Sequence, residues 1–238
     1  MDFSNFVEQA RIAGRLLRAP PVEIAMYGSQ EAWSAYQTFT KPHRRLPFLR
    51  NKTFGVALSP VPQSTDDPFT APAFRAMRRR RKHALSCGYT FAPFEAREFI
   101  DPILAINRSS RLRQGKPLAA SYTDAEAVTR YCERRHPFFG IFDKEQVLRA
   151  YCHAPALGDV VLFARFFGEF ERLEDGIMYL LFAGIAEHLA AARVRDGHPA
   201  WIMYDTFVGG TGGMRTFKER CGFHPYRVNW VWRDGVPS

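Results

Sequence analysis

The stretch Trp201-Ile-Met-Tyr-Asp205-Thr-Phe-Val decides the fold, because it is an apolar run of strand length that leads into a glycine-rich loop, Gly209-Gly-Thr-Gly-Gly213. Phe217-Lys-Glu-Arg-Cys-Gly-Phe223 follows as a short helix, and Arg227-Val-Asn-Trp-Val-Trp232 follows as a final strand. A long apolar helix pattern from Gly176 to Ala192 lies upstream. Helix, strand, glycine loop, helix and strand in this order predict a mixed α/β domain.

The composition indicates a folded protein with a basic surface. The 238 residues are 46% hydrophobic, which is enough for one well-buried core. The net charge of +9 favours anionic partners such as nucleic acid, a phosphorylated cofactor or an acidic membrane face, although it is also compatible with a solubilising surface charge. The four cysteines form no C-x-x-C pair, which indicates buried free thiols in a reducing compartment.

Two segments of the sequence bear on where the protein is located: the N-terminus and the most apolar run. The N-terminus has no basic segment followed by an apolar one, so we expect no secretory signal. The run from Ile177 to Leu189 contains Glu187 and His188, and by itself it is shorter than a membrane span. We therefore expect a soluble cytoplasmic protein with no membrane partner.

Periodicity and breakers predict the remaining elements. Helices are expected over residues 3–18, 31–36, 72–85, 95–107 and 124–135, the last capped by Thr123 or Asp124. Strands are expected over residues 54–58, 89–94, 138–142, 146–153 and 160–167, with the last two forming a hairpin. Residues 108–121 are expected to form a basic, polar loop.

A strand hairpin, then a helix, then strand–helix–strand resembles the C-terminal half of the GNAT acyltransferase fold, over roughly residues 138–232. The segment Phe217 to Phe223 is similar to that family's late helix, which runs into Gly-Phe. The resemblance implies an α/β fold with a GNAT-like mixed central sheet flanked by helices. It also implies a helical N-terminal extension over residues 1–50 and an acyltransferase domain over residues 51–238.

The family holds its acyl donor on backbone N–H groups at the start of the helix that follows the fourth strand. The resemblance places this seat at Gly176 and Ile177, and it implies that the backbone N–H groups near Phe167 and Gly168 hold the carbonyl oxygen of the donor. The chain departs from the family here, because carboxylates that repel a pyrophosphate flank the seat: Glu169, Glu171, Glu174 and Asp175.

A second departure is Lys218, which stands where many family members have a tyrosine as general acid. The resemblance implies that the branch using aminoacyl-tRNA often has lysine or another residue at this place. The donor therefore stays open between acetyl-CoA, another acyl-CoA and an aminoacyl-tRNA. Gly209, Gly210 and Gly212 allow close backbone approach and are expected to line the donor channel, unless they only connect strand to helix.

Amine acylation needs a base, an acid and donors to the developing oxyanion. Glu169, at the end of the fourth strand, is a candidate base or alternatively a helix-capping carboxylate. Asp205 interrupts an apolar strand, so it is either a second candidate base or one partner of a structural ion pair. Tyr204 is a candidate general acid or a core residue.

Two basic segments are candidates for binding the acceptor. The first supplies expected substrate contacts at Asn107, Arg108, Arg111 and Arg113, if it is more than a surface loop. The second, Arg78 to His83, could follow the phosphates of DNA or RNA or be a solvated face. An amine acceptor on a modified base, as in DNA modification, is one possibility. The rival hypothesis is a non-catalytic nucleic-acid-binding protein on a degenerate GNAT fold.

Histidine and cysteine spacing predicts no metal site. Cys152 and His153 are neighbours on an expected strand, so their side chains point to opposite faces. That geometry argues against a thiol-nucleophile hydrolase.

Overall fold

The structure is a computed structural model that describes residues 14, 16–18, 20–44, 46–66, 68–110, 112–113, 116–135, 137–207 and 212–233. The chain forms two compact units that interleave in sequence. The first unit comprises Met1–Val61, Ala156–Leu162 and Asp196–Ser238. The second comprises Pro62–Pro155 and Phe163–Arg195.

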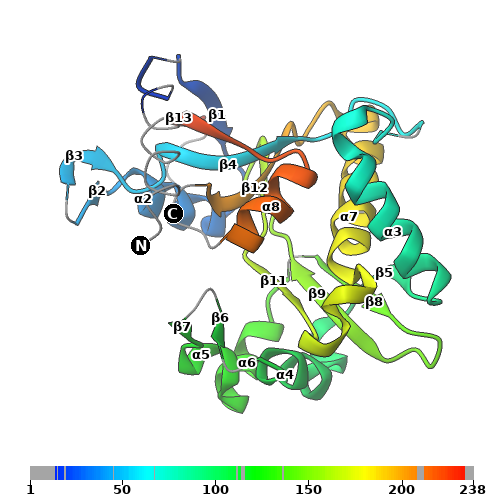
Figure 1. The fold of residues 1–238 in the computed structure, drawn as a ribbon. Coiled ribbons are helices and arrows are strands. Elements are labelled where there is room, and N and C mark those ends of the chain that lie inside the picture. Colours follow the sequence, from blue (N-terminus) through cyan, green and yellow to red (C-terminus); the bar gives the residue numbers. More distant parts are fainter. Residues whose placement is uncertain are drawn as a thin grey trace. The chain divides into compact units, whose positions relative to one another are not determined.

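The first unit is built on a five-stranded mixed sheet in the order β1-β13-β4-β12-β10 (Figure 1). β1 pairs with β13 and β10 with β12 in parallel, whereas β4 is antiparallel to both of its neighbours. The strands are β1 (Val22–Met26), β4 (Phe54–Pro60), β10 (Val160–Leu162), β12 (Trp201–Thr206) and β13 (His224–Trp232). A two-stranded ribbon, β2 (Pro42–His43) with β3 (Leu46–Arg50), completes the strands of this unit.

Helix α2 (Gln30–Thr40) covers one face of this sheet, and Ser29 caps it by accepting a 3.1 Å hydrogen bond from the Ala32 N–H. Its aromatic residues pack on β13, with Phe39 against Trp230. Alternate strand residues on that face form the core: Ile24, Met26, Val56, Leu58, Met203 and Val228. Helix α8 (Gly212–Arg220) packs through Phe217 on Tyr204, which belongs to the opposite set of alternating side chains on β12.

The second unit is built on a four-stranded antiparallel sheet in the order β11-β9-β8-β5. Its strands are β5 (Thr90–Phe94), β8 (Phe138–Phe142), β9 (Leu148–His153) and β11 (Arg165–Gly168). Helix α4 (Ile100–Arg108), helix α5 (Ala120–Thr123) and helix α6 (Ala125–Cys132) cover one face. Two short strands, β6 (Leu112–Arg113) and β7 (Lys116–Pro117), lie between α4 and α5 in sequence.

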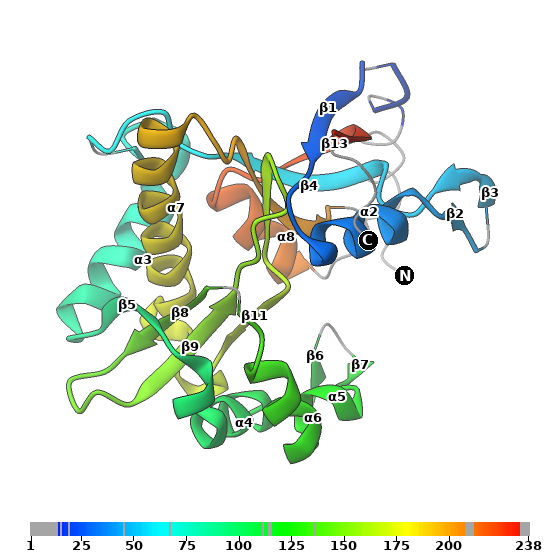
Figure 2. The ribbon, with the colours of Figure 1, turned by 180° about the vertical axis from the view of Figure 1, so that it is seen from behind.

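The other face of that sheet carries α3 (Arg75–Ser86) and α7 (Ile177–Asp196), which lie side by side in both views (Figures 1 and 2). The short 3-10 helices η1 (Pro72–Phe74), η2 (Ala96–Glu98) and η3 (Phe170–Asp175) precede α3, α4 and α7. Gly184 lets α7 approach β5 closely, because a Cβ atom there would lie 2.4 Å from ring carbons of Phe91. Phe91 itself is stacked on Phe139 at 5.7 Å, so it has little room to yield.

Helix α7 is, among the described residues, the one helix long and apolar enough to cross a membrane by length and composition. The full helix is longer than the apolar run on which the sequence expectation was based. However, 56% of its apolar window is buried inside the protein, and a core helix passes the same test. In this fold α7 serves as the central helix of the second unit, with Ile177, Leu181 and Ile185 fully buried.

Most expected elements are confirmed, including the strand Phe138–Phe142 and the Asp124 cap of α6, whose carboxylate accepts from the Ala127 N–H at 2.8 Å. The strand expected over residues 160–167 is wrong in one respect, because it is two strands. β10 pairs with β12 in the first unit, whereas β11 pairs with β9 in the second. The strands that pair are therefore β9 and β11, and β10 lies between them in the sequence but not in the sheet.

The structure also contains elements that the sequence did not predict. β1 (Val22–Met26) follows Pro20-Pro21 and pairs with β13, so a strand lies within residues 1–50, where only helices had been expected. The expected basic loop 108–121 contains β6, β7 and the start of α5. The helix expected over residues 3–18 lies mainly outside the described residues.

Candidate functional site

In the first unit, β12 and α8 bring together the side chains with the most unusual chemistry. Residues Tyr204, Asp205 and Thr206 end β12, and Lys218 comes from the last turn of α8. The register of β12 against β4 shifts between Met203 and Thr206, which is a β-bulge. Bulges re-aim side chains and are frequent beside active sites.

Asp205 occupies this bulge with a φ of 54°, a left-handed conformation that residues other than glycine adopt at a cost. The bulge turns its side chain outward, so that 59% of it is exposed. The carboxylate forms an ion pair with the ammonium of Lys52. Trp230 Nε1 donates a 2.5 Å hydrogen bond to the Lys52 carbonyl, which fixes that segment beside β13.

Lys218 is almost fully buried, with 3% of the residue exposed. Its Nζ atom donates a 2.7 Å hydrogen bond to the Thr206 carbonyl and lies 4.8 Å from the centre of the Tyr204 ring. Burial lowers the pKa of Lys218 to about 8, while Asp205 raises it and Lys52 lowers it. An ammonium with a pKa near neutrality can exchange its proton during a reaction.

The other residues expected at this site have places in the packed core or at the start of a helix. Tyr204 is buried and packs against Phe217 and Phe223, at 6.4 and 6.0 Å between ring centres. Gly212 begins α8 in open space, since a Cβ atom there would meet no atom within 4 Å. Gly209 and Gly210 lie outside the described residues.

In the second unit, Glu169 follows β11 and forms an ion pair with Arg149 of β9, whose Nη1 atom lies 2.9 and 3.2 Å from its two oxygens. Arg149 Nε also donates to Asp143 at 2.6 Å, so one guanidinium joins two carboxylates. Burial raises the pKa of Asp143, but hydrogen bonds from the Val147 N–H and from Arg149 outweigh it and hold that pKa below its usual range. Glu169 stays a predicted base, but its oxygens are engaged by Arg149.

The residues expected to hold the donor lie on both sides of Glu169 in sequence and are closely packed. Phe167 and Gly168 form the β11 ladder with β9, and a Cβ atom on Gly168 would lie 2.5 Å from the sulfur of Met178. Gly176 has a φ of 87° and ends η3, where its N–H donates to the Leu173 carbonyl at 3.2 Å. Ile177 is fully buried as the first residue of α7. The helix therefore starts one residue later than expected, after a separate 3-10 turn.

The expected acceptor residues Asn107 and Arg108 hold the C-terminal end of α5. Asn107 Nδ2 donates to the Tyr122 carbonyl at 2.8 Å, and Arg108 donates to the Thr123 carbonyl at 2.6 and 3.2 Å. These carbonyls belong to the unpaired end of a short helix. Substrate contact by either residue stays a prediction. Arg111 lies outside the described residues, as does the side chain of Arg113.

Arg165 is a buried cation that completes this cap, since its Nη2 atom donates to the Ser121 carbonyl at 2.9 Å. Its guanidinium lies between two aromatic rings, 3.4 Å from the centre of Tyr131 and 4.7 Å from that of Tyr122. Within the described part of the chain, Arg165 has no carboxylate partner, and its Nη1 atom is buried without a hydrogen-bond acceptor. This residue carries no signal in the sequence, because nothing in Phe163-Ala-Arg-Phe-Phe indicates a polar environment.

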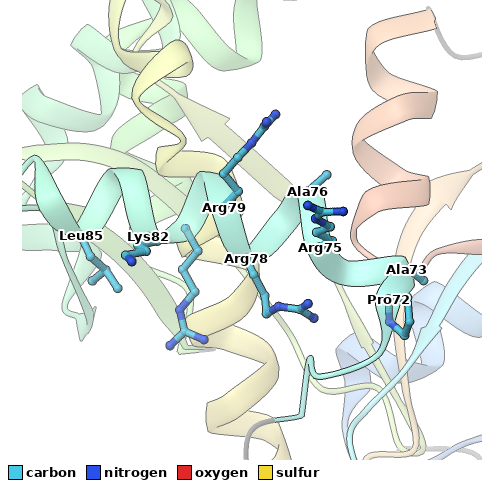
Figure 3. Close-up of a pocket in the computed structure, with 9 residues that line it drawn as sticks. Pro72, Ala73, Arg75, Ala76, Arg78, Arg79, Lys82 and Leu85 are labelled. Atoms are coloured by element: carbon cyan, nitrogen blue, oxygen red, sulfur yellow. The ribbon is translucent and has the colours of Figure 1, made fainter.

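Helix α3 carries the basic run, and some of its arginines have internal roles. Arg81 forms a bidentate ion pair with Glu187 of α7 at 2.5 and 2.9 Å, and Arg80 donates to the Glu174 carbonyl. Arg75, Arg79 and Lys82 repeat at helical spacing and, among the described residues, have no ion-pair partner. Figure 3 shows these three side chains along the helix, where an open hollow of about 880 Å³ is lined by residues of η1 and α3.

Comparisons with known proteins agree on the fold. FemX is similar at 11% identity with a TM-score of 0.54, over 72% of this chain and 59% of that one. The C-terminal domain of a protein described as a lysylphosphatidylglycerol synthetase of Agrobacterium fabrum is similar at 14% identity, with a TM-score of 0.51 over 73% of this chain and 58% of that one. L-PGS of Bacillus licheniformis gives 14% identity and a TM-score of 0.50, over 73% of this chain and 61% of that one.

The chain thus spans about three fifths of the length of these solved structures. No family model and no curated protein sequence matches it. At these identities the likeness establishes the fold. The chain has a mixed α/β, GNAT-like fold, as the order of its last elements predicted.

Proposed function

We propose that this chain, which has an acyltransferase-like fold, transfers an aminoacyl group from an aminoacyl-tRNA to an amine. The observation that carries the proposal is Lys218, a buried lysine whose pKa is lowered to about 8 beside the strand end Tyr204–Thr206. It stands where an acetyl-CoA-dependent enzyme of this fold would use a tyrosine. One structural neighbour is named for joining lysine to phosphatidylglycerol, which is consistent with an aminoacyl donor.

The nature of the leaving group explains why a lysine suits an ester donor. Acyl transfer from coenzyme A releases a thiol, whose ordinary pKa is about 8.5, so the sulfur can leave as a thiolate. Transfer from an aminoacyl-tRNA releases a ribose oxygen, which is far more basic and must be protonated as it leaves. Lys218 is mostly protonated at pH 7 and can donate that proton more readily than an ordinary lysine.

The proposed reaction proceeds in two steps. The acceptor binds as a neutral amine, its nitrogen attacks the ester carbonyl, and the same nitrogen gives one proton to Asp205, whose carboxylate is exposed beside Lys52. The tetrahedral intermediate collapses, the bond from carbon to the ribose oxygen breaks, and Lys218 protonates that oxygen. The products are an amide and a tRNA with a free hydroxyl. Lys218 recovers a proton from solvent, and the proton on Asp205 returns to solvent.

The basic face of α3 supports a polyanionic donor. Arg75, Arg79 and Lys82 span about 10 Å of helix at 1.5 Å per residue, which is enough to contact neighbouring phosphates of a nucleic acid. The same stripe is what would be expected of the rival function, a nucleic-acid-binding protein without catalysis. The two functions differ in Lys218, which a binding protein would not need to bury.

A direct test uses the full chain with a mixture of radiolabelled aminoacyl-tRNAs in one assay and labelled acetyl-CoA in another. Small amines, including a polyamine and a lysine-containing dipeptide, serve as acceptors. We expect acid-soluble amide product from the aminoacyl-tRNA mixture only. Transfer from acetyl-CoA alone would refute the proposed donor. Retention of tRNA without transfer to any of these amines would favour the binding function.

A further inference from the structure

Three side chains with metal-binding chemistry meet at the C-terminal end of α3 in the second unit. His83 and Cys87 are one helical turn apart and project from the same face. Asp175 is the last residue of η3. One ligand atom of each residue lies within 4.8 Å of the others, and the Cys87 sulfur is 3.9 Å from His83 Nε2.

The position of Asp175 is fixed by contacts on both sides of it. The Tyr89 hydroxyl donates a 2.7 Å hydrogen bond to Asp175 Oδ2, and the other oxygen has no hydrogen-bond donor among the residues that the structure describes. Arg80 donates to the carbonyl of the preceding Glu174 at 2.9 Å. The following Gly176 lies so close to α3 that a Cβ atom would be 2.4 Å from the Arg80 carbonyl oxygen. The carboxylate is therefore held against α3 before any ligand binds.

We propose that His83, Cys87 and Asp175 form a binding site for Zn²⁺, with water as the fourth ligand. Imidazole nitrogen, thiolate sulfur and carboxylate oxygen are the ligands that zinc takes in proteins, whereas Mg²⁺ and Ca²⁺ prefer oxygen alone. Tetrahedral zinc with bonds of about 2.3 Å to sulfur and about 2.0 Å to nitrogen would set those two atoms about 3.5 Å apart. The observed 3.9 Å needs only a small side-chain rotation to reach that value.

Binding of Zn²⁺ would change the charge of this site and would link two segments of the chain. Cys87 gives its proton to solvent, and the resulting thiolate together with Asp175 balances the charge of the ion, which matters in the basic surroundings of α3. Tyr89 acts on the metal through Asp175, since its hydrogen bond orients the carboxylate. The bound ion would fasten η3 to the end of α3, immediately before α7 begins. The site is independent of the proposed transfer reaction and of Lys218.

The primary test is titration of the reduced full chain with Co²⁺ as a spectroscopic substitute for zinc. We expect absorption bands of tetrahedral cobalt with a thiolate-to-metal band, at one ion per chain, which added Zn²⁺ abolishes. Cys87→Ser should remove the thiolate band, and His83→Ala and Asp175→Asn should each weaken binding at least tenfold. His224→Ala, which removes an exposed histidine of the first unit, is the matched control and should bind as the parent does. Equal Co²⁺ affinity in the parent and in His83→Ala would overturn the proposal.

Alkylation gives a second measurement that does not depend on the variants folding. Cys87 is half-buried, whereas Cys132, Cys152 and Cys221 are buried, so an alkylating reagent should modify Cys87 first. Burial also raises the pKa of Cys152 and Cys221, which keeps these thiols unreactive. We expect micromolar Zn²⁺ to slow modification of Cys87 at least tenfold in the parent. An unchanged rate of modification would contradict the site.

Discussion

The Nζ atom of Lys218 donates a 2.7 Å hydrogen bond to the carbonyl oxygen of Thr206, which joins the last turn of α8 to the end of β12. This bond holds a buried ammonium in place just where β12 leaves the sheet. Because burial disfavours its charge, the pKa of Lys218 falls to about 8. The same group therefore limits stability and supplies the proton that the proposed reaction requires.

The first prediction concerns stability as a function of pH. The pKa of Lys218 is about 8 in the folded chain and 10.5 ordinarily, so the unfolded chain binds more protons between these values and stability should rise with pH across that window. Lys218→Met removes this dependence. The variant should gain up to about 3 kcal/mol relative to the parent below pH 8, less the lost hydrogen bond, and this gain should shrink as the pH approaches 10.5.

Urea unfolding of both proteins at pH 7, 8.5 and 10 checks this expectation. Lys144→Met, which changes an exposed lysine of the second unit, should show no such pH-dependent difference. A constant difference between Lys218→Met and the parent at all three pH values would show that the lysine has an ordinary pKa.

The second prediction separates the backbone role of Asp205 from its chemical role. Its φ of 54° suits glycine and is tolerated by asparagine. The ion pair with Lys52 is exposed, so its loss should cost less than about 1 kcal/mol. Asp205→Asn should therefore keep the melting temperature nearly unchanged while lowering transfer about 100-fold. Transfer at the parent rate by a folded Asp205→Asn protein would exclude Asp205 as the base.

The third prediction addresses Arg165, the buried cation that caps α5. Arg165→Ala leaves the Ser121 carbonyl without its donor and removes the guanidinium that lies over the rings of Tyr122 and Tyr131. We expect a loss of about 3 kcal/mol in the free energy of unfolding. Arg130→Ala, which removes an exposed ion pair with Glu126, should change it by less than about 0.5 kcal/mol. Similar small losses for both variants in urea unfolding would show that Arg165 does not anchor α5.

The fourth prediction uses salt to examine the α3 stripe. The logarithm of the tRNA-binding constant should fall linearly with the logarithm of the salt concentration, since each protein cation that contacts a phosphate releases counterions. Changing Arg75, Arg79 and Lys82 to glutamine should reduce that slope by about 2 to 3. Arg81→Gln should lower stability with a smaller effect on the slope, because Arg81 is bound to Glu187. A slope unchanged by the triple variant would place the tRNA contact elsewhere.

The C-terminal part of the fold could be predicted from the sequence more completely than the N-terminal part. The run from Trp201 to Trp232 has apolar alternation and a glycine loop, which are local signals, and its elements are confirmed. β1 was missed because Val22–Met26 is short and follows two prolines, and only pairing with β13 shows that it is a strand. The split of residues 160–167 could not be foreseen, since which sheet each half joins is decided by distant partners.

The candidate site was predictable in type but not in detail. Lys218 could be located from its place in the late-helix motif, whereas its burial depends on how α8 packs on Tyr204. Asp205 was identified as an unusual charge, but the bulge that exposes it has no sequence signal. Spacing along the chain does not reveal the cluster of His83, Cys87 and Asp175, because Asp175 comes from a segment far from the other two residues in sequence.

The most direct test of the proposed function compares parent and Lys218→Met in single-turnover transfer from aminoacyl-tRNA, with Lys144→Met as the control. The account predicts product from the parent and the control, and a rate at least 100-fold lower for Lys218→Met at equal tRNA affinity. It also predicts that the parent rate responds to a group with a pKa near 8. Transfer by Lys218→Met at the parent rate, or transfer by the parent from acetyl-CoA alone, would contradict it.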